Sequence, residues 1–152
     1  MRLRGWVFVA GGLAALPVVA ADDVKVPAGK ALFDTTCAVC HQPGGKGMAG
    51  IAPPLADALG QVLAGKDGQR YVANVLVHGL SGRIVSRGQT FNLAMPPQGA
   101  LSDADLAAIA DYVARDLNGR DAAAFSPEDF AAARAARPSH KDLRALREEL
   151  LR

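Results

Sequence analysis

Two cysteines and a histidine stand together in the sequence Cys37-Ala38-Val39-Cys40-His41, and this stretch constrains the chain more than any other. The spacing C-x-x-C-H is typical of a covalent attachment site for c-type haem. On one helical turn the two thiols can add to the two vinyl groups of a haem, and the adjoining imidazole can reach the iron. We therefore predict one haem c, bound through Cys37 and Cys40, with His41 as an axial ligand.

Two other kinds of site also use a C-x-x-C pair, namely a thioredoxin-type redox dithiol and half of a zinc site. A zinc site needs more ligands. Cys37 and Cys40 are the only cysteines in the sequence, and His78 and His140 stand alone. No second C-x-x-C-H occurs, so the sequence favours a protein with a single haem over both alternatives.

The first 21 residues have the layout of a secretory signal peptide. Two arginines precede an apolar run from Trp6 to Val19, and Ala20 and Ala21 close it. A retained membrane anchor is the alternative, but the run is shorter than the roughly 20 residues that a spanning helix needs. We expect cleavage after Ala20 or Ala21, a periplasmic location, and no membrane span after the signal is removed.

Removal of this signal would leave the chain electrically neutral. The sequence holds 17 Lys and Arg against 15 Asp and Glu, and Arg2 and Arg4 would leave with the signal. Nothing in this balance indicates a nucleic-acid partner. Bases outnumber acids between Gln42 and Ala94. If this segment surrounds the haem edge, that edge is mildly positive. An alternative of equal weight is that these charges lie on a solvated surface and do not steer a partner toward the haem.

Capping signals predict helices separated by loops. Pro27 suits the first position of a helix that runs into the haem motif, and Gly79 can end a second helix. Ser102 can cap a third helix, which Asn118-Gly119 would stop. No segment shows strong period-two alternation, so we predict an all-α domain in which the haem supplies much of the core. We expect one helix that starts at Pro27, a second from Asp67 to His78, and a third that follows Ser102.

Met95 is the candidate for the second iron ligand. It stands 54 positions after His41, directly before Pro96-Pro97. A thioether is a soft ligand that favours ferrous iron, and a Met/His pair raises the reduction potential. A loop methionine that only fills a core gap is the alternative. Met48 is too near His41 to reach the opposite haem face, and His78 could ligate instead but suits a helix C-terminus.

With these residues the chain resembles a small bacterial class I cytochrome c over residues 24–118. The likeness rests on the haem motif, on Gly29 and Phe33, on the turn Ala52-Pro53-Pro54-Leu55, and on Met95-Pro96-Pro97 before a helix with Tyr112. The resemblance implies the class I cytochrome c fold, helices wrapped around one haem, in residues 22–119. It also implies that Gly29, Phe33 and Tyr112 form a crossing of the first and last helices. Pro53 would present its carbonyl to Nδ1 of His41, which increases the basicity of the imidazole.

Residues 120–152 extend beyond the minimal family pattern. Ser126-Pro127 and Pro138-Ser139 are typical of helix starts, and Leu143, Leu146 and Leu150 form a stripe on the second of two short helices. The stripe can pack on the haem domain. The alternative is a docking element for a partner enzyme.

The function that the resemblance implies is that of an electron carrier with no catalytic residue. His41 and Met95 would fill both axial positions, so single electrons would pass through the haem edge between redox partners. The partner would be a periplasmic oxidoreductase or a membrane respiratory complex. A cytochrome subunit of a periplasmic dehydrogenase or reductase is one alternative. A ligand-binding haem sensor or haem enzyme is another, if Met95 does not bind the iron.

Overall fold

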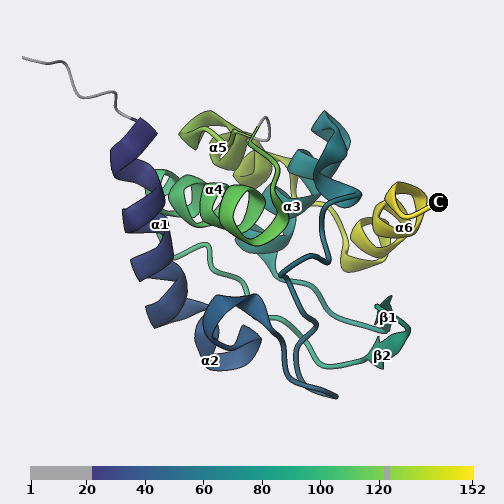
Figure 1. Cartoon of the computed structure of the whole chain (residues 1–152). Helices are drawn as coiled ribbons and strands as arrows, with labels where there is room; N and C mark the ends of the chain where they lie inside the picture. The colour runs from purple at the N-terminus through teal and green to yellow at the C-terminus, as the bar shows by residue number, and fades with distance from the viewer. Residues whose placement is uncertain (1–21, 122–123) are drawn as a thin grey trace, which may run out of the picture.

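The structure is a computed structural model that describes residues 22–121 and 124–152, with side chains described from Ala28 onward. The predicted signal peptide lies outside the described residues. The described part is mostly helical, which confirms the all-α prediction (Figure 1). The helices are α1 (Asp22–Thr36), α2 (Ala38–His41), α3 (Lys66–His78), α4 (Asp103–Asn118), α5 (Pro127–Ala136) and α6 (His140–Leu150), with short 3₁₀ turns at Pro43–Gly45 and Val62–Ala64.

α1 and α4 cross in close contact at Gly29. A Cβ atom at this position would lie 2.0 Å from the carbonyl oxygen of Ala108, so only glycine lets the two backbones approach this closely. The rings of Phe33 and Tyr112 pack beside the crossing with their centroids 5.3 Å apart. The predicted crossing of the first helix with the helix that follows Ser102 is therefore confirmed.

The predicted start of α1 at Pro27 was wrong. The described residues begin within α1, at Asp22, so Pro27 lies inside the helix. Its missing N–H removes one intrahelical hydrogen bond without ending the helix.

The ends of α3 and α4 agree with the capping signals to within one residue. Gly79, with φ of 74°, follows α3 and donates its N–H to Val75. At the start of α4 the Ser102 hydroxyl accepts a hydrogen bond from the Asp105 N–H at 3.1 Å. Gly119 ends α4 in the left-handed conformation.

A short β-hairpin was not predicted. β1 (Ile84–Ser86) pairs antiparallel with β2 (Gln89–Phe91). Arg87 and Gly88 join the strands with φ of 49° and 75°, the pair of left-handed conformations that a type I′ turn needs. Three-residue strands are too short to show an alternation of period two. The glycine at the turn, Gly88, was the remaining sign of a hairpin in the sequence.

The C-terminal helices α5 and α6 pack on the same core as α3 and α4. Phe130 on α5 and Leu143 on α6 are buried in one cluster with Leu76 and Leu106, and Leu146 and Leu150 pack against this cluster. Both helices begin with a capping box, from Ser126 and from Ser139. The leucine stripe therefore packs against the core that α3 and α4 form.

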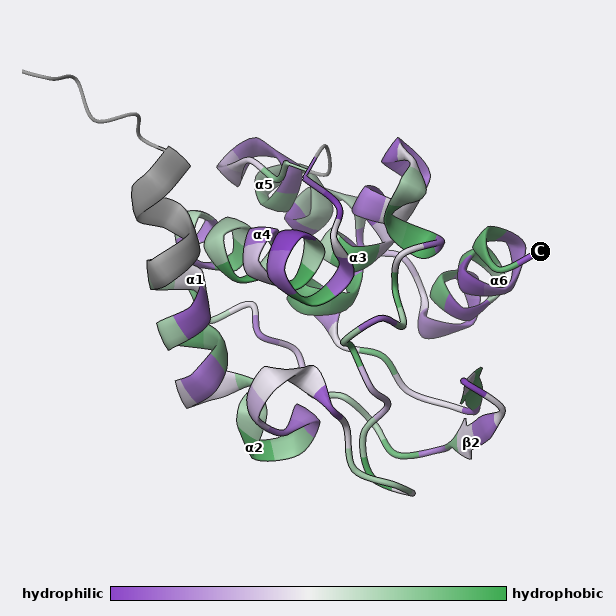
Figure 2. Cartoon of the chain, in the orientation of Figure 1, coloured by the Kyte–Doolittle hydropathy of each residue, from purple (hydrophilic) through white to green (hydrophobic). Residues whose placement is uncertain are grey.

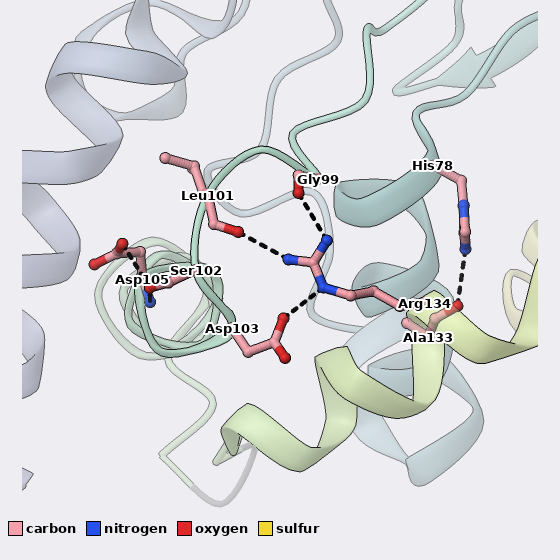
Figure 3. Close-up of polar contacts among 8 residues, drawn as sticks. All are labelled: His78, Gly99, Leu101, Ser102, Asp103, Asp105, Ala133 and Arg134. Carbon is pink, nitrogen blue, oxygen red and sulfur yellow. Dashed lines mark hydrogen bonds and ion pairs between the residues drawn. The ribbon is translucent and has the colours of Figure 1, made fainter.

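Polar contacts tie α5 to the segment that leads into α4. The Arg134 guanidinium donates to Asp103 at 2.7 Å and to the carbonyl oxygens of Gly99 and Leu101 at 2.7 and 2.8 Å (Figure 3). His78 Nε2, at the end of α3, donates to the Ala133 carbonyl at 2.8 Å. These contacts fix both ends of the loop between α3 and α4.

None of the helices in the described ranges has the length and apolar character needed to cross a membrane.

Candidate functional site

A largely apolar cavity of about 310 Å³ lies at the centre of the described structure. Side chains from α1, α3, α4 and the hairpin line it, and the Pro53 turn and the Met95 loop complete its wall. The apolar lining includes Phe33, Val72, Leu76, Phe91, Ile109 and Val113. A cavity of this size and lining suits a large apolar cofactor with a few polar attachment points.

The two cysteines line this cavity together. Cys37 closes the last turn of α1, where its N–H donates to the Phe33 carbonyl at 2.8 Å. The single turn of α2 then places Cys40 and His41 three and four residues further, on the same side. Both thiols are free, Cys37 half-buried and Cys40 exposed, and burial raises the pKa of Cys37 to about 11.

His41 is 7% exposed and lines the cavity. Its Nδ1 lies 2.9 Å from the carbonyl oxygen of Pro53. A carbonyl oxygen only accepts, so Nδ1 holds the proton and the neutral ring keeps a lone pair on Nε2. Burial lowers the pKa of His41, and the Pro53 hydrogen bond opposes this shift. The imidazole is therefore neutral and oriented, which is what a metal ligand requires.

Local backbone geometry places the Pro53 carbonyl. Gly47, with φ of 76°, packs against the proline turn, and a Cβ there would lie 2.5 Å from the Pro54 nitrogen. The Gly47 N–H donates to the His41 carbonyl at 2.7 Å, and Met48 N–H donates to Ala52 at 2.8 Å. The loop after the haem motif thus folds back over the imidazole.

Met95 lines the same cavity from a different segment. Its loop pairs with the end of α3, since Leu80 and Met95 exchange backbone hydrogen bonds of 3.1 and 2.8 Å. Gly79 makes this approach possible, because a Cβ there would lie 2.5 Å from the Met95 carbonyl oxygen. Met48 and His78, the other residues considered as ligands, are not in the cavity lining.

Comparisons with known proteins identify the family of this chain. The family described as Cytochrome c matches residues 26–115. The chain belongs to the cytochrome c family. A cytochrome c-552 of Thermus thermophilus is 36% identical over 104 residues, 68% of this chain and 64% of that protein. A second Thermus thermophilus cytochrome c-552 is 38% identical over 78 residues, 51% of this chain and 60% of that protein. Cytochrome c6 of Picosynechococcus is 38% identical over 100 residues, 64% of this chain and 76% of that protein.

The donor set fits the haem c that the family implies. Two free thiols and an oriented neutral imidazole line one apolar cavity, and a thioether lines it from a loop 54 residues further along the chain. Thiolates and a histidine on one turn suit thioether attachment and proximal ligation, and the thioether is a soft ligand for iron. In the described ranges no cluster of three or more His, Cys, Asp or Glu forms another metal site.

Some cavity residues were not predicted as site residues. Phe91 reaches the cavity through the hairpin. Tyr71 lies in the helix expected from Asp67 to His78, and Arg147 lies in the extension of residues 120–152. All three line the cavity. The spacing of Leu143 and Arg147, four residues apart on one helix, was the signal that could have placed Arg147 on the inner face.

Proposed function

We propose that this cytochrome c is an exported, periplasmic carrier of single electrons. One haem c would be attached through Cys37 and Cys40 and ligated by His41 and Met95. The observation that carries the proposal is that these four side chains, from two distant segments, line one apolar cavity. The cytochrome names of the relatives, from Thermus and Picosynechococcus, support the same function.

When bound, haem supplies a one-electron couple at its iron. The chain contributes the environment of that couple. His41 is held by Pro53, Met95 is held by Leu80, and the apolar lining keeps water away from both. Ligands held in this way would need little rearrangement when the charge of the iron changes.

The open rim of the cavity is the proposed route for the electron. Ile51 and Leu93 line the cavity and are 46% and 58% exposed, and Val39 stands exposed beside Cys40. A reduced donor protein would give one electron through this rim, and an oxidised acceptor would remove it in a second encounter. Exposed apolar residues grouped in this way are typical of a surface at which another protein docks. The donor and acceptor are redox proteins of the periplasm or its membrane.

Mass spectrometry of the protein purified from the periplasm tests attachment and export together. We expect one covalent haem and the loss of 20 or 21 N-terminal residues. Cys37→Ala and Cys40→Ala should each leave one thioether, and the double variant should hold no covalent haem. A haem-free protein with two intact thiols would contradict the proposal.

A redox titration of the purified protein tests the carrier function. We expect one reversible step that transfers one electron. Turnover of a substrate, or tight carbon monoxide binding by the ferrous form, would instead favour a haem enzyme or a ligand-binding sensor.

A further inference from the structure

Arg147 is a buried charged side chain in the wall of the haem cavity. It lies on α6, outside the segment that matches the family, and is only 7% exposed. The guanidinium makes no ion pair with a carboxylate among residues 28–121 and 124–152. A buried charge costs several kcal/mol unless an opposite charge accompanies it. The position of Arg147 therefore calls for an anion inside the cavity.

Tyr71 on α3 lies beside Arg147 in the cavity wall. Burial raises the pKa of Tyr71 to about 12, and the charge of Arg147 and a hydrogen bond with its side chain oppose this rise. The phenol is neutral at physiological pH, so it leaves the charge of the guanidinium uncompensated. It can also donate a hydrogen bond to an anion bound at this end of the cavity.

Haem itself carries suitable anions. Its vinyl groups and its two propionate carboxylates occupy opposite halves of the ring. Attachment at Cys37 and Cys40 would hold the vinyl half near α2, so the propionates would face the other side of the cavity. Figure 1 shows α2 and α6 on opposite sides of the molecule, and Arg147 brings α6 to the cavity.

We propose that Arg147 binds a haem propionate, so that the C-terminal extension completes the cofactor site. This inference rests on the proposed function, because it requires haem in the cavity. A guanidinium can form two parallel hydrogen bonds with a carboxylate, the strongest arrangement available to such a pair. Figure 2 shows both hydrophilic and hydrophobic residues on α6, as expected for a helix that packs in the core and also holds a charge.

α6 is held in the position that this contact needs. Leu143, one turn before Arg147, is buried in the core. The Arg144 guanidinium donates to the Ser81 carbonyl oxygen, and His140 Nδ1 bonds the Ser81 hydroxyl. Arg144 therefore holds the helix in place. Lys141, an exposed cation on the same helix that does not line the haem cavity, is the matched control for Arg147.

The test is the reduction potential of the haem-loaded full-length protein. A cation in the cavity stabilises the ferrous form, which has one positive charge fewer than the ferric form. Arg147→Gln should lower the ratio of reduced to oxidised protein roughly tenfold at fixed ambient potential, as expected for one unit charge at low effective dielectric. A tenfold change corresponds to about 59 mV for a one-electron couple. Arg147→Lys should keep most of the potential, and Lys141→Gln should leave it unchanged.

An unchanged potential in Arg147→Gln, or an equal fall in Lys141→Gln, would overturn the propionate contact. If Arg147→Gln does not mature, a crystal structure of the unmodified haem protein decides. A guanidinium nitrogen within about 3.2 Å of a propionate oxygen supports the inference, and a guanidinium turned away from haem refutes it. Absence of haem from the unmodified protein would instead refute the proposed function, so the two failures are distinguishable.

Discussion

Single residues set the distances on which the haem site depends, and Gly29 is the clearest case. The carbonyl oxygen of Ala108 occupies the space that a side chain at this position would need. Gly29→Ala should force α1 and α4 apart and reduce the free energy of unfolding by about 3 kcal/mol. Chemical denaturation of the haem-loaded protein measures this loss.

Gly60→Ala provides the matched control. The nearest atoms to a Cβ at Gly60 belong to the flexible Arg120 side chain at 3.7 Å. This variant should change the free energy of unfolding by no more than about 0.5 kcal/mol. Equal losses in the two variants would show that close approach of α1 and α4 is not the reason for glycine at position 29.

At the scale of an element, the N-terminus of α6 responds to pH. Hydrogen bonds from the Ser139 hydroxyl and N–H hold the pKa of Asp142 below its usual 3.8. A lowered pKa in the folded state contributes stability that is present above pH 3.8 and is lost as pH falls through the folded value. Asp142→Asn should therefore melt at a lower temperature than the unmodified protein at neutral pH, and the difference should shrink in acid.

Thermal melts at several pH values check this behaviour. Glu149→Gln removes an acid from the exposed end of the same helix and serves as the control. Its melting temperature should follow that of the unmodified protein at each pH. A constant difference between Asp142→Asn and the unmodified protein down to strong acid would show that the Asp142 charge does not stabilise α6.

Elements with strong end signals could be predicted from the sequence, and weakly marked ones could not. Ser102 and Gly119 mark α4 at both ends, and the structure has them as caps. The hairpin at Ile84–Phe91 was missed because its stability comes from tertiary contacts rather than from a repeating pattern. The start of α1 was misplaced because the described residues before Pro27 are already helical, so this proline does not mark the first position of the helix.

The residues of the candidate site also divide into those that a sequence signal marks and those that it does not. Cys37, Cys40 and His41 follow from local spacing, and Met95 follows from ligand chemistry and its proline-rich loop. Pro53 could be named only through the family resemblance, since a backbone carbonyl has no sequence signature. Arg147 was missed because its spacing from Leu143 places it on the inner face of α6 but does not show that this helix docks at the cavity.

At the scale of the whole molecule, the C-terminal extension shares one core with the haem domain. Phe125, Phe130 and Leu143 are buried among residues of α3 and α4. Truncation after Asn118 should therefore lower the melting temperature of the haem protein by several degrees, because the faces that cover α3 and α4 are lost. Unchanged melting with slower reaction at a partner protein would instead identify the extension as a docking element.

The cavity also predicts that folding depends on haem. Without the cofactor, the apolar lining of α3, α4 and the hairpin surrounds a void of about 310 Å³. Such a void costs stability because its lining loses packing contacts. The Cys37→Ala, Cys40→Ala double variant, prepared free of haem, should show little helical circular dichroism. A cooperative melt close to that of the haem protein would contradict this expectation.

The central claim is that His41 and Met95 ligate one haem, and optical spectroscopy tests it most directly. The unmodified protein should be low-spin, show the weak far-red sulfur-to-iron band when ferric, and resist carbon monoxide when ferrous. Met95→Ala should abolish the band, admit carbon monoxide and lower the potential. Met48→Ala, the control outside the cavity, should change none of these. A high-spin unmodified protein that binds carbon monoxide readily, or a Met95→Ala spectrum identical to that of the unmodified protein, would contradict the account.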